Sequence, residues 1–110
     1  MLIRIFHARV RPGKQADFKK VLELLTLPAA RASSGMVAFY PGQPLGPDSN
    51  DFVLVTVWKE RKGLVGRSLE EWERAIIPTA ALPLVEDWHI EGYKAFGVLE
   101  QSLQPLFQNI

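Results

Sequence analysis

The chain has 110 residues, of which 47% are hydrophobic and 23% charged, a composition typical of a folded globular domain and not of a disordered segment. Its formal net charge of +1 excludes the strongly basic surface with which proteins hold a phosphate backbone, and the lack of cysteine excludes disulfides, thiolate metal sites and cysteine nucleophiles. Arg4 and His7 interrupt the apolar N-terminus, which disfavours a signal peptide or a membrane span. We therefore expect a single cytoplasmic domain over residues 1–110, with neither nucleic acid nor membrane as a partner.

The first element is predicted to be a strand over residues 2–11, because β-branched and aromatic side chains alternate there until Pro12-Gly13 ends the pattern. Alternation divides this strand into a core face and a mixed face. The expected core face holds Phe6, Ala8 and Val10, and the mixed face holds Ile3, Ile5, His7 and Arg9.

A helix is predicted to begin at Lys14, because apolar residues then recur at helical spacing. Its buried stripe is expected to be Phe18, Val21, Leu22 and Leu25. Pro28 removes a backbone donor and should end or kink the helix, although the alanines that follow permit another turn before Gly35. A second strand is predicted over residues 36–40, followed by a proline- and glycine-rich loop over residues 41–48.

Residues 52–58 have the strongest strand pattern in the sequence. The uniformly aliphatic face, Val53, Val55 and Val57, is expected to lie under the helices, and the mixed face is expected to hold Phe52, Leu54, Thr56 and Trp58. Ser68 and Glu71 then form a capping box, which predicts a second helix ending before Pro78. A last strand is predicted over residues 88–96, and a tail over residues 98–110 is apolar enough to pack against the domain.

The predicted order, strand-helix-strand-strand-helix-strand, is that of the split β-α-β arrangement. It predicts an α+β, ferredoxin-like domain whose helices cover one face of a four-stranded antiparallel sheet. The mixed strand faces would then expose a contiguous apolar patch, which a monomer rarely leaves uncovered. A twofold-related second copy is the commonest cover, so we expect a homodimer.

With these features the chain resembles the antibiotic biosynthesis monooxygenase family of the dimeric α+β barrel superfamily. The resemblance rests on four segments and spans residues 2–97. They are Val10-Arg11-Pro12-Gly13-Lys14, Phe18 at the start of the helix, Ser33-Ser34-Gly35, and Val55-Thr56-Val57-Trp58-Lys59-Glu60, with the last strand ending near Glu91-Gly92-Tyr93.

The resemblance implies a cavity that binds a small hydrophobic, aromatic or quinol molecule, which some relatives oxygenate without metal or flavin. An electron-rich phenolate can itself reduce dioxygen, so the protein needs a dry pocket, a base and a partner for the developing anion. We expect His7 to be the base and Arg9 the anion partner, with no cofactor. The expected substrate-binding residues are Trp58, Tyr40, Tyr93 and Thr56.

His89 and Glu91 are two residues apart, so both project from one face of the last strand, which should neighbour the first strand and His7. Two histidines and a carboxylate are the ligand set of a non-haem iron site. Because their facing does not follow from the sequence, the interpretation adopted is that they are surface or interface residues, and no metal is assigned.

Three other functions stay open. A dimeric module that only binds a metabolite or assembles with another protein is compatible with the fold, because function depends on the site and not on the fold. An isomerase or lyase with His7 as a proton shuttle would work without oxygen. Haem degradation is known in the same superfamily, where a histidine of the second helix is the axial ligand of the haem iron. It ranks low here because the predicted second helix offers Trp72 but no histidine.

Overall fold

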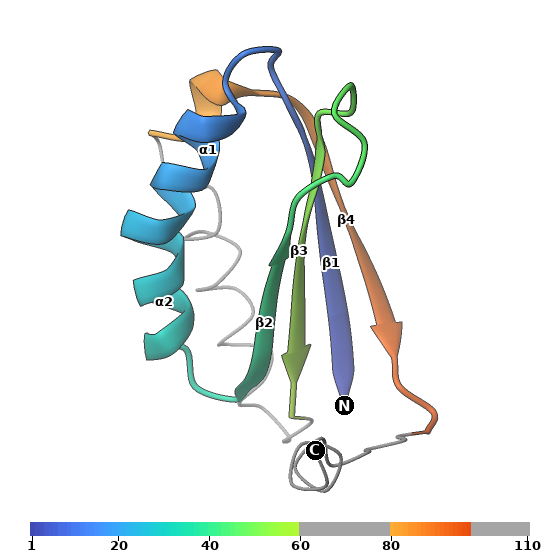
Figure 1. Ribbon diagram of the computed structural model, residues 1–110. Helices are drawn as coiled ribbons and strands as arrows, with labels where there is room; N and C mark the ends of the chain where they lie inside the picture. Colours follow the sequence, from blue (N-terminus) through green and yellow to red (C-terminus); the bar gives the residue numbers. More distant parts are fainter. Residues whose placement is uncertain (60–79, 98–110) are drawn as a thin grey trace, which may run out of the picture.

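The computed structural model describes residues 1–59 and 80–97, in which a helical layer covers one face of a four-stranded antiparallel sheet (Figure 1). The elements in chain order are β1 (Leu2–Val10), α1 (Gln15–Val21), a π-helical turn (Leu22–Thr26), α2 (Leu27–Ala32), β2 (Met36–Gly42), β3 (Asp51–Trp58), a 3-10 turn (Leu82–Leu84) and β4 (Val85–Lys94). The strand order in the sheet is β2-β3-β1-β4, and every pairing is antiparallel. The predicted α+β fold with a four-stranded antiparallel sheet is confirmed.

Two predicted segments, the helix that begins at Ser68 and the tail over residues 98–110, lie outside the described residues. Within the part of the chain that is described, no helix has the length and apolarity needed to cross a membrane.

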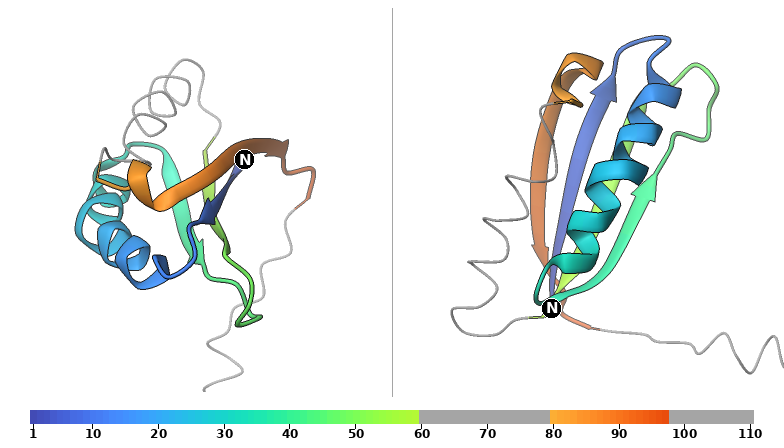
Figure 2. Two further views of the ribbon diagram at one scale, coloured as in Figure 1. Left: turned by 90° about the horizontal axis from the view of Figure 1, so that it is seen from above. Right: turned by 90° about the vertical axis from the view of Figure 1, so that its left-hand side faces the viewer.

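The helix does not end at Pro28, and the further turn that the alanines permit is present as α2, which ends at Ala32. A π turn precedes the proline, and the Leu27 amide donates to the carbonyl of Leu22, five residues back. Pro28 therefore falls within the first positions of α2, where a missing amide donor costs little. The helical layer runs unbroken along one face of the sheet (Figure 2).

The π turn also changes which side chains the helix buries. A π turn takes up more residues than an α turn, so the buried positions recur at intervals of four. They are Phe18, Leu22, Thr26 and Ala30. The expectation for Leu25 is wrong, because this side chain is 48% exposed, and Thr26 is fully buried in its place.

The core forms between this helix and the even-numbered residues of β1 and β3. Phe6, Ala8 and Val10 of β1 are buried, as predicted. The rings of Phe18 and Phe52 meet edge to face with centroids 5.2 Å apart, which joins α1 to β3. We call this side of the sheet the helix face.

The predicted facing of β3 is wrong. Phe52, Leu54, Thr56 and Trp58 are the buried residues, and Val53, Val55 and Val57 lie on the opposite side. Register explains the result, because Phe52 pairs with Ala8 and Leu54 with Phe6, and directly paired residues share a face. Burying two aromatic rings and a leucine also removes more apolar area from water than burying three valines.

Strand β2 extends further than the sequence pattern indicated, through Pro41 to Gly42. Proline cannot donate to a neighbouring strand, but β2 is an edge strand that pairs only with β3, so one side of it needs no donor.

The facing of β3 can be tested with two leucines. Replacing the buried Leu54 by alanine should lower the free energy of unfolding by about 2–5 kcal/mol, because it leaves a cavity in the core. Leu45→Ala, at a fully exposed side chain, should change it by less than ~0.5 kcal/mol. Urea unfolding measures both values, and equal effects of the two substitutions would contradict the observed facing.

Candidate functional site

The other side of the sheet, which we call the open face, carries the odd-numbered residues of β1, β3 and β4. Among the described elements, all helical ones lie on the helix face, so none covers the open face (Figure 2). Cross-strand pairing arranges the open face in rows that run β3-β1-β4. The rows are Asp51-Arg9-Asp87, Val53-His7-His89, Val55-Ile5-Glu91 and Val57-Ile3-Tyr93. One end of the face is therefore charged and the other is mostly aliphatic.

Glu91 is the centre of a polar cluster on this face. Its Oε1 atom lies 3.2 Å from Nε2 of His7 and 3.1 Å from Nε2 of His89. Its Oε2 atom accepts a hydrogen bond from the hydroxyl of Tyr93. Because an ionised carboxylate can only accept, His89, which hydrogen-bonds to Oε1, must carry a proton on Nε2. His7 forms an ion pair with the same oxygen when its ring is protonated. We call these four residues, His7, His89, Glu91 and Tyr93, the Glu91 cluster.

The two imidazoles of the Glu91 cluster stack across the β1–β4 boundary. Their centroids are 4.4 Å apart and their planes differ by 11°. This contact follows from register, because His7 and His89 are direct partners and point to the same side. The backbone pairing of two neighbouring strands therefore brings the rings together, and no flexible loop is involved.

The hydrogen bonds of the cluster favour a charged carboxylate. The hydroxyl of Tyr93, followed by the imidazole of His89, lowers the pKa of Glu91 below its ordinary value. The same carboxylate raises the pKa of Tyr93, because it stabilises the protonated phenol. Glu91 is thus an ionised acceptor that fixes the orientation of two neighbouring donors, His89 and Tyr93, and attracts the ring of His7.

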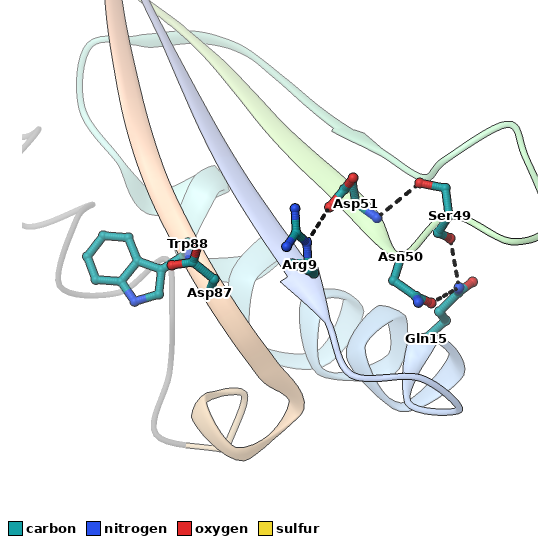
Figure 3. Close-up of polar contacts among 7 residues, drawn as sticks. All are labelled: Arg9, Gln15, Ser49, Asn50, Asp51, Asp87 and Trp88. Atoms are coloured by element: carbon teal, nitrogen blue, oxygen red, sulfur yellow. Dashed lines mark hydrogen bonds and ion pairs between the residues drawn. The ribbon is translucent and has the colours of Figure 1, made fainter.

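A polar hollow of about 210 Å³ lies beside the histidines, lined by His7, Ala8, Arg9, Asp51, Asp87 and His89. Arg9 donates through Nε to Oδ1 of Asp51 at 3.2 Å (Figure 3). The start of β3 is in turn attached to the helix, because the side chain of Gln15 donates to the carbonyl of Ser49 and to Oδ1 of Asn50. These contacts hold Arg9 at the edge of the hollow that His7 lines.

A broader apolar hollow of about 790 Å³ lies at the other end of the open face. Its lining is Ile3, Ile5, Tyr93, Lys94, Ala95, Phe96 and Gly97. Tyr93 belongs both to this hollow and to the Glu91 cluster. A flat apolar molecule placed here would have the polar cluster at one end.

The structure separates the residues that the sequence proposed for the site. His7 and Arg9 lie in neighbouring rows of the open face. Tyr93 is on the same face but pairs with Ile3, three rows from Arg9, and Tyr40 is on the far edge strand, beyond β3 and β1. Trp58 and Thr56 are wrongly placed by the sequence interpretation. They are buried on the helix face, where Nε1 of Trp58 donates to Oγ1 of Thr56 at 2.8 Å.

The sequence interpretation omitted Glu91 and His89 from the site and considered them only as metal ligands. The available signal was the alternation His89-x-Glu91-x-Tyr93, which projects three polar side chains from one face of a strand. The pairing of β4 with β1, expected from the order of the elements, adds His7 to these side chains, whereas the register that places them on one face does not follow from the sequence.

The order β-α-β-β followed by β4, with the helical layer on one face of an antiparallel sheet, defines an α+β fold of the ferredoxin-like type. No protein-family model and no curated protein sequence matches the chain. Solved structures do share its fold. One is a Nitrosomonas europaea protein assigned to the antibiotic biosynthesis monooxygenases, with 20% identity, a TM-score of 0.69, and coverage of 88% of this chain and 100% of that one.

Two further solved structures are similar in fold. The Nitrosomonas europaea protein NE2512, of unknown function, has 20% identity and a TM-score of 0.72, with coverage of 92% of this chain and 94% of that one. A mutant form of MhuD, with two manganese protoporphyrin IX molecules bound per active site, has 14% identity and a TM-score of 0.69, with coverage of 92% of this chain and 100% of that one.

The link between Tyr93 and Glu91 can be tested with the two tyrosines of the chain. Tyr93→Phe should raise the pKa of Glu91 toward its ordinary value, because it removes the hydrogen bond that lowers this pKa most. Tyr40→Phe, on the same face but outside the cluster, is the matched control. A carboxyl-carbon NMR titration measures the pKa, and the same value in the wild type and in Tyr93→Phe would refute the contact.

Proposed function

We propose that the chain is a homodimeric, cofactor-independent monooxygenase that acts on a small aromatic or quinol substrate, with His7 as the base. The observation that supports this best is the Glu91 cluster, in which an ionised carboxylate orients His7 beside Arg9 and next to an apolar surface. The fold shared with an antibiotic biosynthesis monooxygenase is consistent with this activity, although fold alone does not determine function.

The orientation of His7 suits it to accept a proton. Nε2 of His7 lies 3.2 Å from Oε1 of Glu91, and a carboxylate oxygen repels a lone pair, so we infer that the neutral ring carries its proton on Nε2. Its lone pair is then on Nδ1, to which no hydrogen bond is found within the described residues. Glu91 would also stabilise the imidazolium that forms when Nδ1 takes a proton, as the carboxylate does in other His–carboxylate pairs. Arg9, on the rim of the same hollow, is paired with Asp51 through Nε, and its terminal guanidinium nitrogens would donate hydrogen bonds to the substrate anion.

The reaction needs no redox group from the protein, because the substrate provides the electrons. Once deprotonated, a hydroquinone can transfer electrons to dioxygen, and a carbon–oxygen bond then forms on its ring. In the balanced reaction, hydroquinone and O₂ give hydroxyquinone and water, so one oxygen atom enters the product and the other leaves as water. The substrate gives up four electrons, and the proton taken by His7 ends in the water.

The layout of the open face suits a ring with a hydroxyl at one end. The ring would lie over Ile3 and Ile5, in the apolar hollow, and the hydroxyl would reach toward the Glu91 cluster. In a monomer this surface is open to solvent, which would screen the charges that the reaction depends on. A second copy packed on the same face would exclude water from it.

The dimer proposed here rests on the apolar residues of the open face. Ile3, Ile5, Val53, Val55 and Val57 are all partly exposed in the single chain, and Tyr40 and Tyr93 are exposed beside them. A closed twofold contact would bury this patch on both copies.

The dimer is tested by Val55→Asp, at the middle of the open face. The wild type should sediment as a dimer at micromolar concentration. The dimer dissociation constant of the variant should be at least ~100-fold higher, because the twofold contact would bury two unpaired carboxylates, one from each copy. Leu45→Asp is the control, since Leu45 lies in the loop between β2 and β3 and is fully exposed. A wild type that sediments as a 12.4 kDa monomer would contradict the proposal.

The activity is tested by oxygen uptake with a panel of hydroquinones and anthrones. His7→Ala should lower turnover by roughly 10²–10⁴-fold, the usual contribution of a general base. Glu86→Gln should leave turnover unchanged, because Glu86 lies at the exposed start of β4, where the pairing with β1 is irregular, and outside the cluster.

Three outcomes would contradict the oxygenase proposal. Equal uptake by the wild type and His7→Ala would exclude His7 as the base. A ligand-dependent rise in melting temperature with no oxygen uptake would indicate a binding module instead. Conversion of a substrate without oxygen would indicate an isomerase or lyase.

A further inference from the structure

The Glu91 cluster holds three side chains whose donor atoms are those of a transition-metal site. Ligand atoms of His7, His89 and Glu91 all lie within 4.8 Å of one another. His7 and His89 are also the only two histidines in the sequence, which has no cysteine. Apart from methionine, the histidines of this cluster are therefore the only nitrogen or sulfur side chains in the sequence that commonly bind transition metals.

We propose that His7, His89 and Glu91 bind one divalent first-row transition-metal ion. Two imidazoles and one carboxylate favour zinc, cobalt, nickel or iron(II) over magnesium and calcium, which prefer sites made of oxygen alone. Three protein ligands on one side of the ion leave positions free toward solvent, which is the arrangement of a reactive or exchangeable metal site and not of a closed structural one.

The distances to the carboxylate already fit such a site. Bonds of about 2.0–2.1 Å at a tetrahedral ion place neighbouring ligand atoms roughly 3.3 Å apart. The observed separations from Oε1 of Glu91 are 3.2 Å for His7 and 3.1 Å for His89. The metal would replace the Nε2 proton that His89 donates to this oxygen and would lie between the oxygen and Nε2 of His7.

One movement is required. The two rings are nearly parallel, with an interplanar angle of 11°, so their Nε2 lone pairs point in similar directions and must converge on the ion. Rotation of one imidazole about its side-chain bonds achieves this, and the side chain of His89, 61% exposed, has room to turn. The strand backbones can stay in place, because His7 and His89 are already direct cross-strand partners.

The surroundings of Glu91 support the same role. Tyr93 donates a hydrogen bond to Oε2 of Glu91, the carboxylate oxygen that neither histidine contacts. This bond fixes the carboxylate so that Oε1 faces the ion, as hydrogen bonds to metal ligands commonly do. Asp51 and Asp87 line the adjoining hollow, and the charge of Arg9 there is offset by its ion pair with Asp51. A cation therefore meets a net negative surface beside the histidines.

Metal binding would also control the activity proposed above, and this part of the inference rests on that proposed function. An imidazole that binds metal through Nε2 carries its proton on Nδ1. Nδ1 of His7 could then no longer accept a proton from a substrate. The metal-loaded protein should therefore be inactive as a cofactor-independent oxygenase.

The site is tested by titrating tag-free, metal-free protein with Co²⁺ and recording the visible absorption of the bound ion. We expect saturation at one ion per chain. His7→Ala and His89→Ala should each weaken binding by at least roughly 100-fold, and Glu91→Gln by at least roughly 10-fold, because each removes one of three ligands. Glu86→Gln, which removes a β4 carboxylate outside the cluster, should bind like the wild type. Circular dichroism verifies that each variant is folded.

Two results would overturn the site: no saturable Co²⁺ binding by the wild type, or binding that neither histidine substitution weakens. Oxygen uptake with and without one equivalent of Zn²⁺ separates this inference from the proposed function. Metal binding that leaves uptake intact would support the site and refute His7 as the base. Uptake by the metal-free protein without any metal binding would refute the site and leave the proposed function standing.

Discussion

The alternation of side chains along the central strand β1 is the constraint on which the rest of this structure depends. β1 pairs with β3 on one side and β4 on the other. The face to which each β1 residue points therefore determines the face to which its partners in β3 and β4 point. The even-numbered residues, Phe6, Ala8 and Val10, are buried beneath the helical layer. The odd-numbered residues are consequently turned to the open face. A one-residue slip of β1 would move His7 into the core and a phenylalanine to the surface.

Glu91 gives the open face its chemical character. Its carboxylate accepts hydrogen bonds from the imidazole of His89 and the phenol of Tyr93 and lies 3.2 Å from Nε2 of His7, so it gathers groups from two strands around a single negative charge. Oriented histidines of this kind serve both as bases and as metal ligands, and the two uses exclude each other at His7. The presence or absence of a metal ion would thus decide which chemistry the face performs. The adjoining apolar rows offer a surface for a flat substrate or for a second copy of the chain.

Much of the fold follows from the sequence because it depends on local patterns. Hydrophobic periodicity, ended by proline and glycine, predicts three elements: the strand at residues 2–11, the helix after Lys14 and the strand at residues 52–58. The order of the elements then predicts the antiparallel sheet. The facing of β3 was not predictable in this way. Alternation shows that two faces differ but not which one is buried, and pairing with β1 decides this in favour of the aromatic face.

The site was less predictable for the same reason. His7 and Tyr93 were proposed from residue type, yet Trp58 was assigned to the wrong side of the sheet together with the rest of its strand face. His89 and Glu91 acquire meaning only when β4 lies beside β1, a long-range contact that no short motif encodes. The passage of the helix through Pro28 likewise depends on a π turn, which places the proline at the start of α2 and which no local pattern in the sequence indicates.

The most direct test of this account is the nitrogen NMR spectrum of the two histidine side chains in metal-free protein. The arrangement around Glu91 predicts that both rings are protonated on Nε2 when neutral, with nuclear Overhauser contacts between the ring protons of His7 and His89. The absence of any contact between the two rings would show that β1 and β4 do not place these side chains together on one face, and protonation of the neutral His7 ring on Nδ1 would contradict its role as the base.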